Sequence, residues 1–426
     1  MALKDLLADT RPLQNPNFRR LWFAEMITVV GAQLTVVAVP AQIYADTGSS
    51  AYVGLTGLFG LVPLVVFGLY GGALADAFDR RTIVRITSIG LIVCSALFFL
   101  QAALGNTNPW LLLCLFSVQQ CFFAVDSPTR AAILPRILEP EVLPAANSLH
   151  YTVFQAGAIA GPLVAGILIP ITGFPLLYLL DTFALGAILY AVVRLPPLPV
   201  DGEVKVPGIR SVIDGLSYLR TQPILMMSFV VDLIAMVFGM PRALFPEQAH
   251  THFHGPSDGG LAFALLFAAI PAGAVIGGVL GGWLTRVRRQ GLAVIWCIVI
   301  WGVGITVYGI ADWLAPHTQW VVMLVVALIA LAVAGAADMF SAAIRTSILQ
   351  SAADDAVRGR LQGIFTVVVG GGPRIADTLH GGVAAGIGVS ATAAGGGVLV
   401  VIGVVVAALV VPSFVRYRMV PAAARR

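Results

Sequence analysis

Charge is scarce in this chain. Only 11% of its 426 residues are Asp, Glu, Lys or Arg, while 58% are hydrophobic. A soluble protein carries roughly 25% charged residues, so the composition excludes an ordinary soluble domain and indicates a polytopic membrane protein. Lysine occurs only at Lys4 and Lys205. The other basic residues are arginines spread along the chain, which excludes a basic nucleic-acid-binding domain, and we expect no nucleic-acid partner.

Cysteines and cofactor-binding motifs are equally sparse. The four cysteines all fall within apolar runs, so no disulfide framework is expected. The glycines of "VVVGGGPR" (367–374) are not followed by the Lys-Ser/Thr pair of a phosphate loop, which leaves ATP-driven transport unsupported. The alternating histidines of "HTHFH" (250–254) lack the acids or cysteines that a metal centre needs. We therefore expect neither a cofactor nor a metal.

Long apolar runs make up most of the chain. A helix needs about 20 apolar residues to cross the hydrocarbon core, and a span must be helical because lipid offers the backbone no hydrogen-bond partner. Twelve spans are predicted, at residues 19–44, 52–76, 83–104, 109–128, 148–170, 174–194, 223–249, 261–284, 291–311, 319–341, 361–385 and 393–413. The sequence thus predicts an all-α, multi-pass membrane protein.

Basic residues occur in alternate loops. The loops after the odd-numbered spans contain no Lys or Arg, whereas both ends of the chain, the remaining loops and the middle linker contain them. Arg345, Arg358 and Arg360, for example, follow the tenth predicted span. Because basic residues concentrate in cytoplasmic loops, this pattern predicts that both termini are cytoplasmic.

The chain divides into two similar halves. We expect a six-helix bundle at residues 1–194, a cytoplasmic linker at 195–222 and a second six-helix bundle at 223–426. "RAAILPRILEPEVLPAANSL" (130–149) aligns without gaps to "RTSILQSAADDAVRGRLQGI" (345–364), which matches Arg130 to Arg345. Such a repeat is typical of transporters that rock two bundles around a central site.

The stretch "GGALADAFDRR" (71–81) lies in the loop after the second span. It resembles the signature loop of the major facilitator superfamily, although Ala77 and Asp79 stand where the family has Arg and Gly. The resemblance implies the fold of the major facilitator superfamily, with two six-helix bundles. It also implies that this loop forms a latch at the inner gate. The latch residues would be Gly72, Asp76, Arg80 and Arg81, with Arg80 reaching Asp126. The alternative interpretation is an ordinary cytoplasmic basic loop.

The fifth predicted span contains "GAIAGPLVAG" (157–166). It resembles the antiporter signature of the superfamily at Gly157, Gly161, Pro162 and Gly166. Small residues four apart allow close helix packing, and a proline permits a kink. The resemblance implies an exporter, while the alternative is ordinary packing of small residues.

Further fragments narrow the resemblance. "FGMPRALFP" (238–246), "AAIPAGAVIGGVLGG" (268–282), "VRGRLQGIF" (357–365) and "GGPRIADTLHGG" (371–382) resemble the enterobactin exporter group of the superfamily, as does the stretch from Asn15 to Tyr44. The resemblance implies proton-coupled export of a catecholate siderophore across the cytoplasmic (inner) membrane of a bacterium. Macrolide and multidrug exporters share this scaffold, so multidrug efflux is the alternative function.

Several acids lie within predicted spans, and four of them are candidates for proton coupling. Insertion of an ionisable side chain into the membrane costs roughly 2.5–3.5 kcal/mol on insertion scales, so we expect each of these acids to have a functional or structural role. The candidates for proton coupling are Glu25, Asp181, Asp232 and Asp377. The alternative for each is a structural ion pair or hydrogen-bonded acid. Arg374 can bridge to Asp377, since residues three apart share one face of a helix.

A catecholate siderophore is aromatic and acidic, so its cavity should offer cations. Arg242 and Arg374 are the two basic side chains expected deep in the membrane. Neutral ligands for the substrate would be Gln33, Gln119, Gln120 and Gln155. A membrane-embedded enzyme or sensor is the alternative class, but only His380 lies within a span interior, and we expect no catalytic residues. The expected partners are the small-molecule substrate, protons and the lipid bilayer, with the chain working as a monomer.

Overall fold

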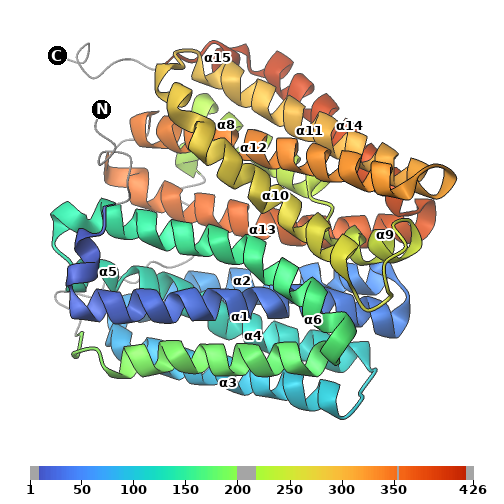
Figure 1. Cartoon of the computed structure of the whole chain (residues 1–426). Helices are drawn as coiled ribbons and strands as arrows, with labels where there is room; N and C mark the ends of the chain where they lie inside the picture. The colour runs from blue at the N-terminus through green and yellow to red at the C-terminus, as the bar shows by residue number, and fades with distance from the viewer. Residues whose placement is uncertain (1–8, 199–216, 353–354, 419–426) are drawn as a thin grey trace. The chain divides into compact units, whose positions relative to one another are not determined.

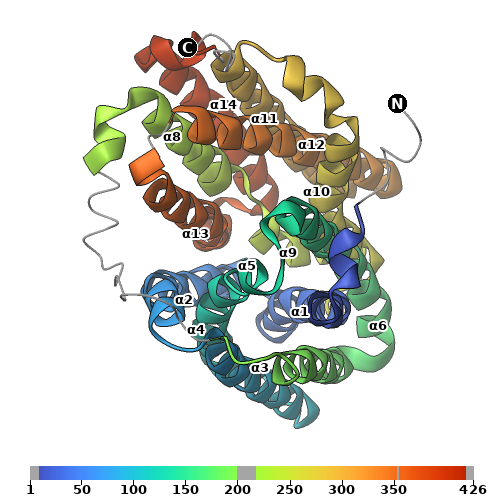
Figure 2. The ribbon, with the colours of Figure 1, turned by 90° about the vertical axis from the view of Figure 1, so that its left-hand side faces the viewer.

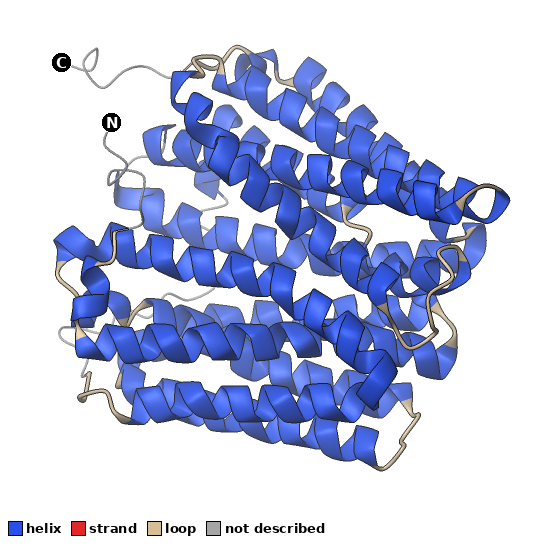
Figure 3. Cartoon of the chain, in the orientation of Figure 1, coloured by secondary structure: helices blue, strands red, loops and turns tan. Residues whose placement is uncertain are grey.

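The computed structural model describes residues 9–198, 217–352 and 355–418, without the side chains of 69–77, 283, 285–286, 350–352 and 355–367. Every regular element in the described part of the chain is a helix (Figures 1 and 3). The helices are α1 (Pro16–Thr47), α2 (Ser50–Ala77), α3 (Arg80–Ala103), α4 (Pro109–Ala131), α5 (Leu134–Ile137), α6 (Leu143–Val193), α8 (Pro223–Gly239), α9 (Phe245–Thr251), α10 (Leu261–Leu280), α11 (Gln290–Leu314), α12 (Trp320–Ala352), α13 (Asp355–Ile387), α14 (Val389–Val410) and α15 (Pro412–Val415).

Within these described residues, 10 helical stretches are long and apolar enough to cross a membrane. The prediction of an all-α, multi-pass membrane protein is therefore confirmed, while the number twelve and the cytoplasmic termini stay predictions. The predicted spans at 148–170 and 174–194 fall on the two arms of α6. At Gly173 between them, φ is 71° and ψ is −176°, a conformation that glycine adopts without steric cost.

The seventh predicted span, at 223–249, is not one continuous helix. Its path runs through α8, a 3₁₀ turn η4 (Arg242–Leu244) and α9. Met240 is extended, with φ −104° and ψ 97°, as the residue before a proline prefers. Pro241 lacks the N–H that would continue the helix, so the run breaks there and Arg242 begins a separate turn.

The chain forms two compact units. Unit 1 contains Met1–Gln42 and Val62–Gly208, and unit 2 contains Ile43–Leu61 and Ile209–Arg426. Ile43–Leu61, which belongs to the predicted first half, lies in unit 2. This segment packs on α13 within unit 2, where a Cβ atom on Gly57 would lie 2.1 Å from the Arg374 carbonyl oxygen. The division into the halves that would move during transport stays a prediction.

Each unit has its own helix packing. In unit 1, α3 lies against α4 and α6 (Figure 2). In unit 2, α11 packs against both α12 and α14, α10 packs on α12, and α8 contacts α13 and α14. These contacts bring charged residues from well-separated stretches of the sequence into the interior of unit 2.

Candidate functional site

Unit 2 contains a buried ion pair between α8 and α12. Arg345 Nη1 lies 2.6 Å from Asp232 Oδ1, and the two side chains are only 3% and 2% exposed. Arg345 Nε also donates a hydrogen bond to Ser341 Oγ, and a second acid, Asp338, has its Oδ1 3.9 Å from Arg345 Nη2. Removing two charges from water costs several kcal/mol per ion unless they are paired, so these residues are stable here only together.

This pair corrects one prediction from the sequence. Arg345 is not in a loop, because α12 continues past the predicted end at residue 341. The sequence pattern misses this because the partner that stabilises Arg345, Asp232, is on a helix far away in the sequence. The position of Arg242 and Arg374 deep in the membrane stays a prediction.

A second charged cluster joins η4 to α13. Asp377 is partly buried within electrostatic reach of both Arg242 and Arg374. Arg374 and Asp377 lie three residues apart on α13, which places them on one helix face. Arg242 joins them because η4 packs against α13. Two guanidinium groups and one carboxylate give this cluster a formal charge of about +1 when all three groups are ionised.

Unit 1 holds its most buried acid differently. Asp181 on α6 is 1% exposed, and its Oδ2 accepts hydrogen bonds from Thr35 Oγ1 at 2.6 Å and Ser95 Oγ at 3.1 Å. The donors come from α1 and α3, so Asp181 links three helices of unit 1. Its partners in the described chain are hydroxyl groups rather than arginines.

The fourth candidate acid, Glu25, has an ionisable partner. Its Oε1 lies 2.6 Å from His150 Nδ1, and the two side chains are 20% and 52% exposed. The pair links α1 to the start of α6. Glu25 is therefore less buried than Asp181 or Asp232.

Asp126, a residue of the predicted latch, is bound within unit 1. Its Oδ2 lies 2.5 Å from Arg130 Nε, one turn later on α4, and its Oδ1 accepts a hydrogen bond from Thr87 at 2.6 Å. An interaction of Arg80 with Asp126 stays a prediction. Gly72 and Asp76 lie in the stretch of α2 whose side chains are outside the described residues, so their roles in the latch also stay predictions.

The departure from the family pattern at Asp79 has a structural role. Asp79 is the N-cap of α3, where its Oδ1 accepts from the Arg81 N–H and its Oδ2 from Thr82 Oγ1. Oδ1 also accepts from the Leu198 N–H at 3.0 Å, and Arg81 Nη2 donates to the Val193 carbonyl. The loop residues thus bind the chain that follows α6.

The antiporter-like motif forms a close contact between α6 and α1. Gly157, Gly161, Pro162 and Gly166 are all buried. A Cβ atom on Gly157 would lie 2.4 Å from Val29 Cγ1, and one on Gly161 would lie 2.3 Å from Gln33 Cβ. A larger residue at either position would force Val29, Gln33 or the helices themselves to shift.

The predicted glutamine ligands have varied surroundings. Gln119 and Gln120 are buried on α4, Gln155 is partly buried on α6, and Gln33 packs on Gly161. Their role in binding a substrate stays a prediction.

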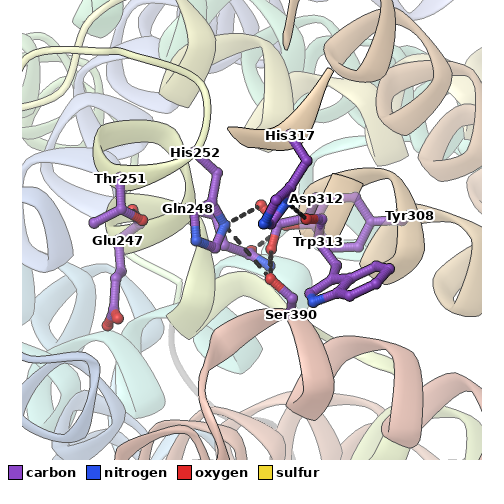
Figure 4. A network of polar contacts seen from close by, with 9 residues as sticks. All are labelled: Glu247, Gln248, Thr251, His252, Tyr308, Asp312, Trp313, His317 and Ser390. Atoms are coloured by element: carbon purple, nitrogen blue, oxygen red, sulfur yellow. Dashed lines mark hydrogen bonds and ion pairs between the residues drawn. The ribbon is translucent and has the colours of Figure 1, made fainter. Parts of the chain in front are cut away.

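One polar cluster of unit 2 is missing from the sequence-based candidates (Figure 4). Asp312, at the end of α11, accepts hydrogen bonds from Gln248 Nε2 at 2.8 Å and Ser390 Oγ at 2.6 Å, and it pairs with His252 Nδ1 at 2.9 Å. The Tyr308 hydroxyl donates to Gln248 Oε1. Asp312 follows directly after the predicted span 291–311, and an acid at a span end facing a histidine-rich loop is the only signal in the sequence. Among the described residues, no group of three or more His, Cys, Asp or Glu is placed to hold a metal ion.

Comparison with known proteins identifies the family. Residues 8–423 match the model of the transmembrane secretion effector family. The chain belongs to this family. It is a transporter of the major facilitator type, in agreement with the resemblance that the sequence motifs carry. The enterobactin exporter EntS of Shigella boydii is 27% identical to it over 415 residues, which cover 96% of this chain and 94% of that protein. The enterobactin exporter EntS of Escherichia coli matches with the same identity and coverage.

Solved structures share the fold of this family member. The nucleoside transporter NupG is 12% identical, with a TM-score of 0.71 over 93% of this chain and 99% of its own. A bacterial homologue of the iron transporter ferroportin is 15% identical, with a TM-score of 0.67 over 94% and 98%. These relatives and structural neighbours are membrane transporters rather than enzymes.

Proposed function

We propose that this chain is a secondary active exporter that moves an acidic organic solute of the catecholate siderophore class out of the cytoplasm in exchange for protons. The observation that carries the substrate class is the cluster of Arg242 and Arg374 around one acid, Asp377. The similarity to enterobactin exporters along nearly the whole chain supports the same class.

The charge balance of this cluster favours an anion. Its formal charge of about +1 lies among helices of unit 2, where water and salt screen charges poorly. An acidic solute would restore neutrality there, whereas a cationic drug would meet two guanidinium groups. A guanidinium group also matches a carboxylate or deprotonated catechol in shape, because its N–H donors form a planar fork.

Buried acids with a free carboxylate oxygen support proton coupling. Asp181 Oδ1, Asp232 Oδ2 and Asp377 Oδ1 are buried atoms without a hydrogen-bond partner among the described residues. A proton on such an oxygen removes a charge that is expensive to hold away from water. One pH unit supplies about 1.4 kcal/mol per proton, and 100 mV supplies about 2.3 kcal/mol, which is enough to concentrate a solute.

The proposed cycle follows the superfamily pattern. Two bundles, at 1–194 and 223–426, would alternately open a central site to either side of the cytoplasmic membrane, with the loop at 71–81 holding the inner gate. The arginine pattern of the loops supports cytoplasmic termini. We propose a monomer of twelve spans, because each bundle of the repeat supplies one side of the site.

Inverted membrane vesicles that contain the protein test this function. With an acid interior, they should accumulate an iron-free catecholate siderophore, and a protonophore should abolish the accumulation. Vesicles with Asp232→Asn should retain exchange of solute across the membrane but lose uphill accumulation. Accumulation that persists with the protonophore would refute proton coupling.

The charge of the substrate separates export of a siderophore from multidrug efflux. Arg242→Ala should lower uptake of the anionic siderophore by about tenfold or more, the factor expected for a lost hydrogen bond between charged groups. Uptake of ethidium, a cation, should not fall. If the vesicles accumulate ethidium but no siderophore, the result would indicate multidrug efflux instead of siderophore export.

A further inference from the structure

The network around Asp312 is separate from the charged clusters that the proposed function uses. We propose that His252 and Asp312 form a proton-binding site, in which protonation of the His252 ring fastens the segment after α9 to α11 and α14. The site itself does not depend on the proposed function. Only its position on the outer side of the membrane rests on the proposed topology.

The surroundings of Asp312 call for a positive charge. Its side chain is 0% exposed. Its Oδ2 accepts hydrogen bonds from Gln248 and Ser390, and its Oδ1 faces His252. The Tyr308 hydroxyl donates to Gln248 Oε1, which directs the amide N–H₂ of Gln248 toward Asp312. Both carboxylate oxygens are therefore occupied by donors, and a positive charge beside this carboxylate would offset the cost of burying it.

His252 is placed to provide that charge. Its side chain is 22% exposed, so protons reach it from the solvent, while its Nδ1 lies 2.9 Å from the buried carboxylate. Nδ1 carries a hydrogen to bond this acceptor, which leaves Nε2 as the atom that gains the proton. Burial lowers the pKa of His252, but the hydrogen bond to Asp312 and the charges of Asp312 and Glu247 raise it by more, so the net shift is upward.

The charged groups that face His252 from the neighbouring helices are acids. Asp312 lies on α11 and Glu247 on α9, while α14 contributes Ser390, which does not titrate. The neighbouring histidines are engaged elsewhere. His250 Nδ1 bonds the Gly255 carbonyl, and His317 Nδ1 bonds the Trp313 carbonyl of its own helix. His252 is thus the histidine of this cluster whose charge a buried acid can balance.

The sign of the pH effect follows from the raised pKa of His252. The folded protein binds this proton more tightly than the unfolded chain does, so protonation stabilises the fold. This contribution is fully present below about pH 6.5, the ordinary histidine value, and disappears as the pH rises through the raised value. An acidic outer medium should therefore hold the end of unit 2 together more firmly.

Thermal unfolding of the full-length protein in lipid nanodiscs tests the site. His252→Gln keeps a side-chain N–H for Asp312 but binds no proton. At about pH 5.5 its unfolding midpoint should be about 2–4 °C below that of the wild type, and at about pH 8.5 the two should coincide. His317→Gln is the matched control and should match the wild type at both values. An equal loss from His252→Gln at both values, or a pH-dependent loss from His317→Gln, would overturn the proposal.

Transport measurements separate this proposal from the proposed function. In vesicles that export the siderophore, His252→Gln should flatten the dependence of export on the pH of the outer side, whereas His317→Gln should leave it unchanged. A wild type that transports no siderophore would refute the proposed function alone. The nanodisc comparison would then still decide whether the proton site exists.

Discussion

Arg130 of unit 1 and Arg345 of unit 2 occupy matching positions of the internal repeat, but their acids come from different places. Arg130 pairs with Asp126, four residues earlier on the same helix, and its side chain is 24% exposed. Arg345 has Ser341 at that position and pairs with Asp232 on another helix, at 3% exposure. The arginine at this position of the repeat thus pairs within its own helix in unit 1 and with another helix in unit 2.

The buried acids extend this difference. Asp181 of unit 1 is held by hydroxyl groups, whereas Asp232 and Asp377 of unit 2 face arginines. The charged pairs of unit 2 thus link separate helices, α8 to α12 and η4 to α13. In unit 1, Asp181 has neutral donors instead, and the Asp126–Arg130 pair stays within one helix.

The largest expected effect comes from removing the arginine of each pair. Arg345→Met should lower the free energy of unfolding by about 3–5 kcal/mol, because Asp232 stays buried without a counter-ion. Arg130→Met should cost about 1–2 kcal/mol, because this partly exposed pair lies between the surface and buried cases and Asp126 retains Thr87. Titration with SDS in mixed micelles measures both losses.

A double variant distinguishes the loss of a counter-ion from a general packing defect. Asp232→Leu combined with Arg345→Met removes both charges and should recover much of the loss from Arg345→Met alone. Equal losses from Arg345→Met and Arg130→Met, or no recovery in the double variant, would contradict the distinction between the two pairs.

Exchanging each acid for its neutral isostere should have the next largest effect. Asp232→Asn leaves Arg345 with only the more distant Asp338, at 3.9 Å, as a counter-ion, and it should cost about 2–3 kcal/mol of unfolding free energy. Asp181→Asn should cost less than about 1 kcal/mol, because the amide oxygen still accepts from Thr35 or Ser95. The same SDS titration measures both, and the reverse order of losses would show that hydroxyl groups hold an acid more strongly than Arg345 does.

The sequence predicts the helices well because a single segment in lipid must satisfy its backbone N–H and C=O groups by its own helical hydrogen bonds. Apolar runs such as 83–104 and 291–311 fall on α3 and α11 for this reason. The break at Pro241 is also visible in the residues, although hydropathy alone joins the segments on either side of it.

Partners that lie far apart in the sequence could not be predicted. Arg345 is basic and follows an apolar run, so its sequence pattern indicates a loop, and only Asp232 on α8 explains its burial. Asp312 meets His252 for a similar reason, since α11 ends beside the segment after α9. Hydropathy and motifs describe each helix alone, whereas these sites arise from packing between helices.

The contact between α1 and α6 tests whether unit 1 relies on close packing. Gly161→Ala places a Cβ atom 2.3 Å from Gln33 Cβ and should cost about 1–3 kcal/mol of unfolding free energy, as overpacking does. Gly186 lies on the same helix, and a Cβ atom added there would meet no neighbouring helix or side chain within 4 Å. Gly186→Ala should therefore be neutral or stabilising by up to about 1 kcal/mol, the gain in helix propensity. Equal effects in the SDS titration would mean that α1 moves away without cost.

The smallest expected effect concerns Asp79, whose contacts are local to one end of unit 1. Asp79→Ala removes the N-cap of α3 and should cost about 1 kcal/mol in the same titration, whereas glycine, the residue of the superfamily signature, costs only a few tenths of a kcal/mol as an N-cap. Asp79 also accepts a hydrogen bond from the Leu198 N–H, which no glycine side chain can replace. If Asp79→Gly costs as much as Asp79→Ala, the bond to Leu198 matters more than the cap, and unit 1 too uses a charge to join separate segments. If Asp79→Gly is nearly neutral, the charge acts on α3 alone and the contrast with Arg345 holds.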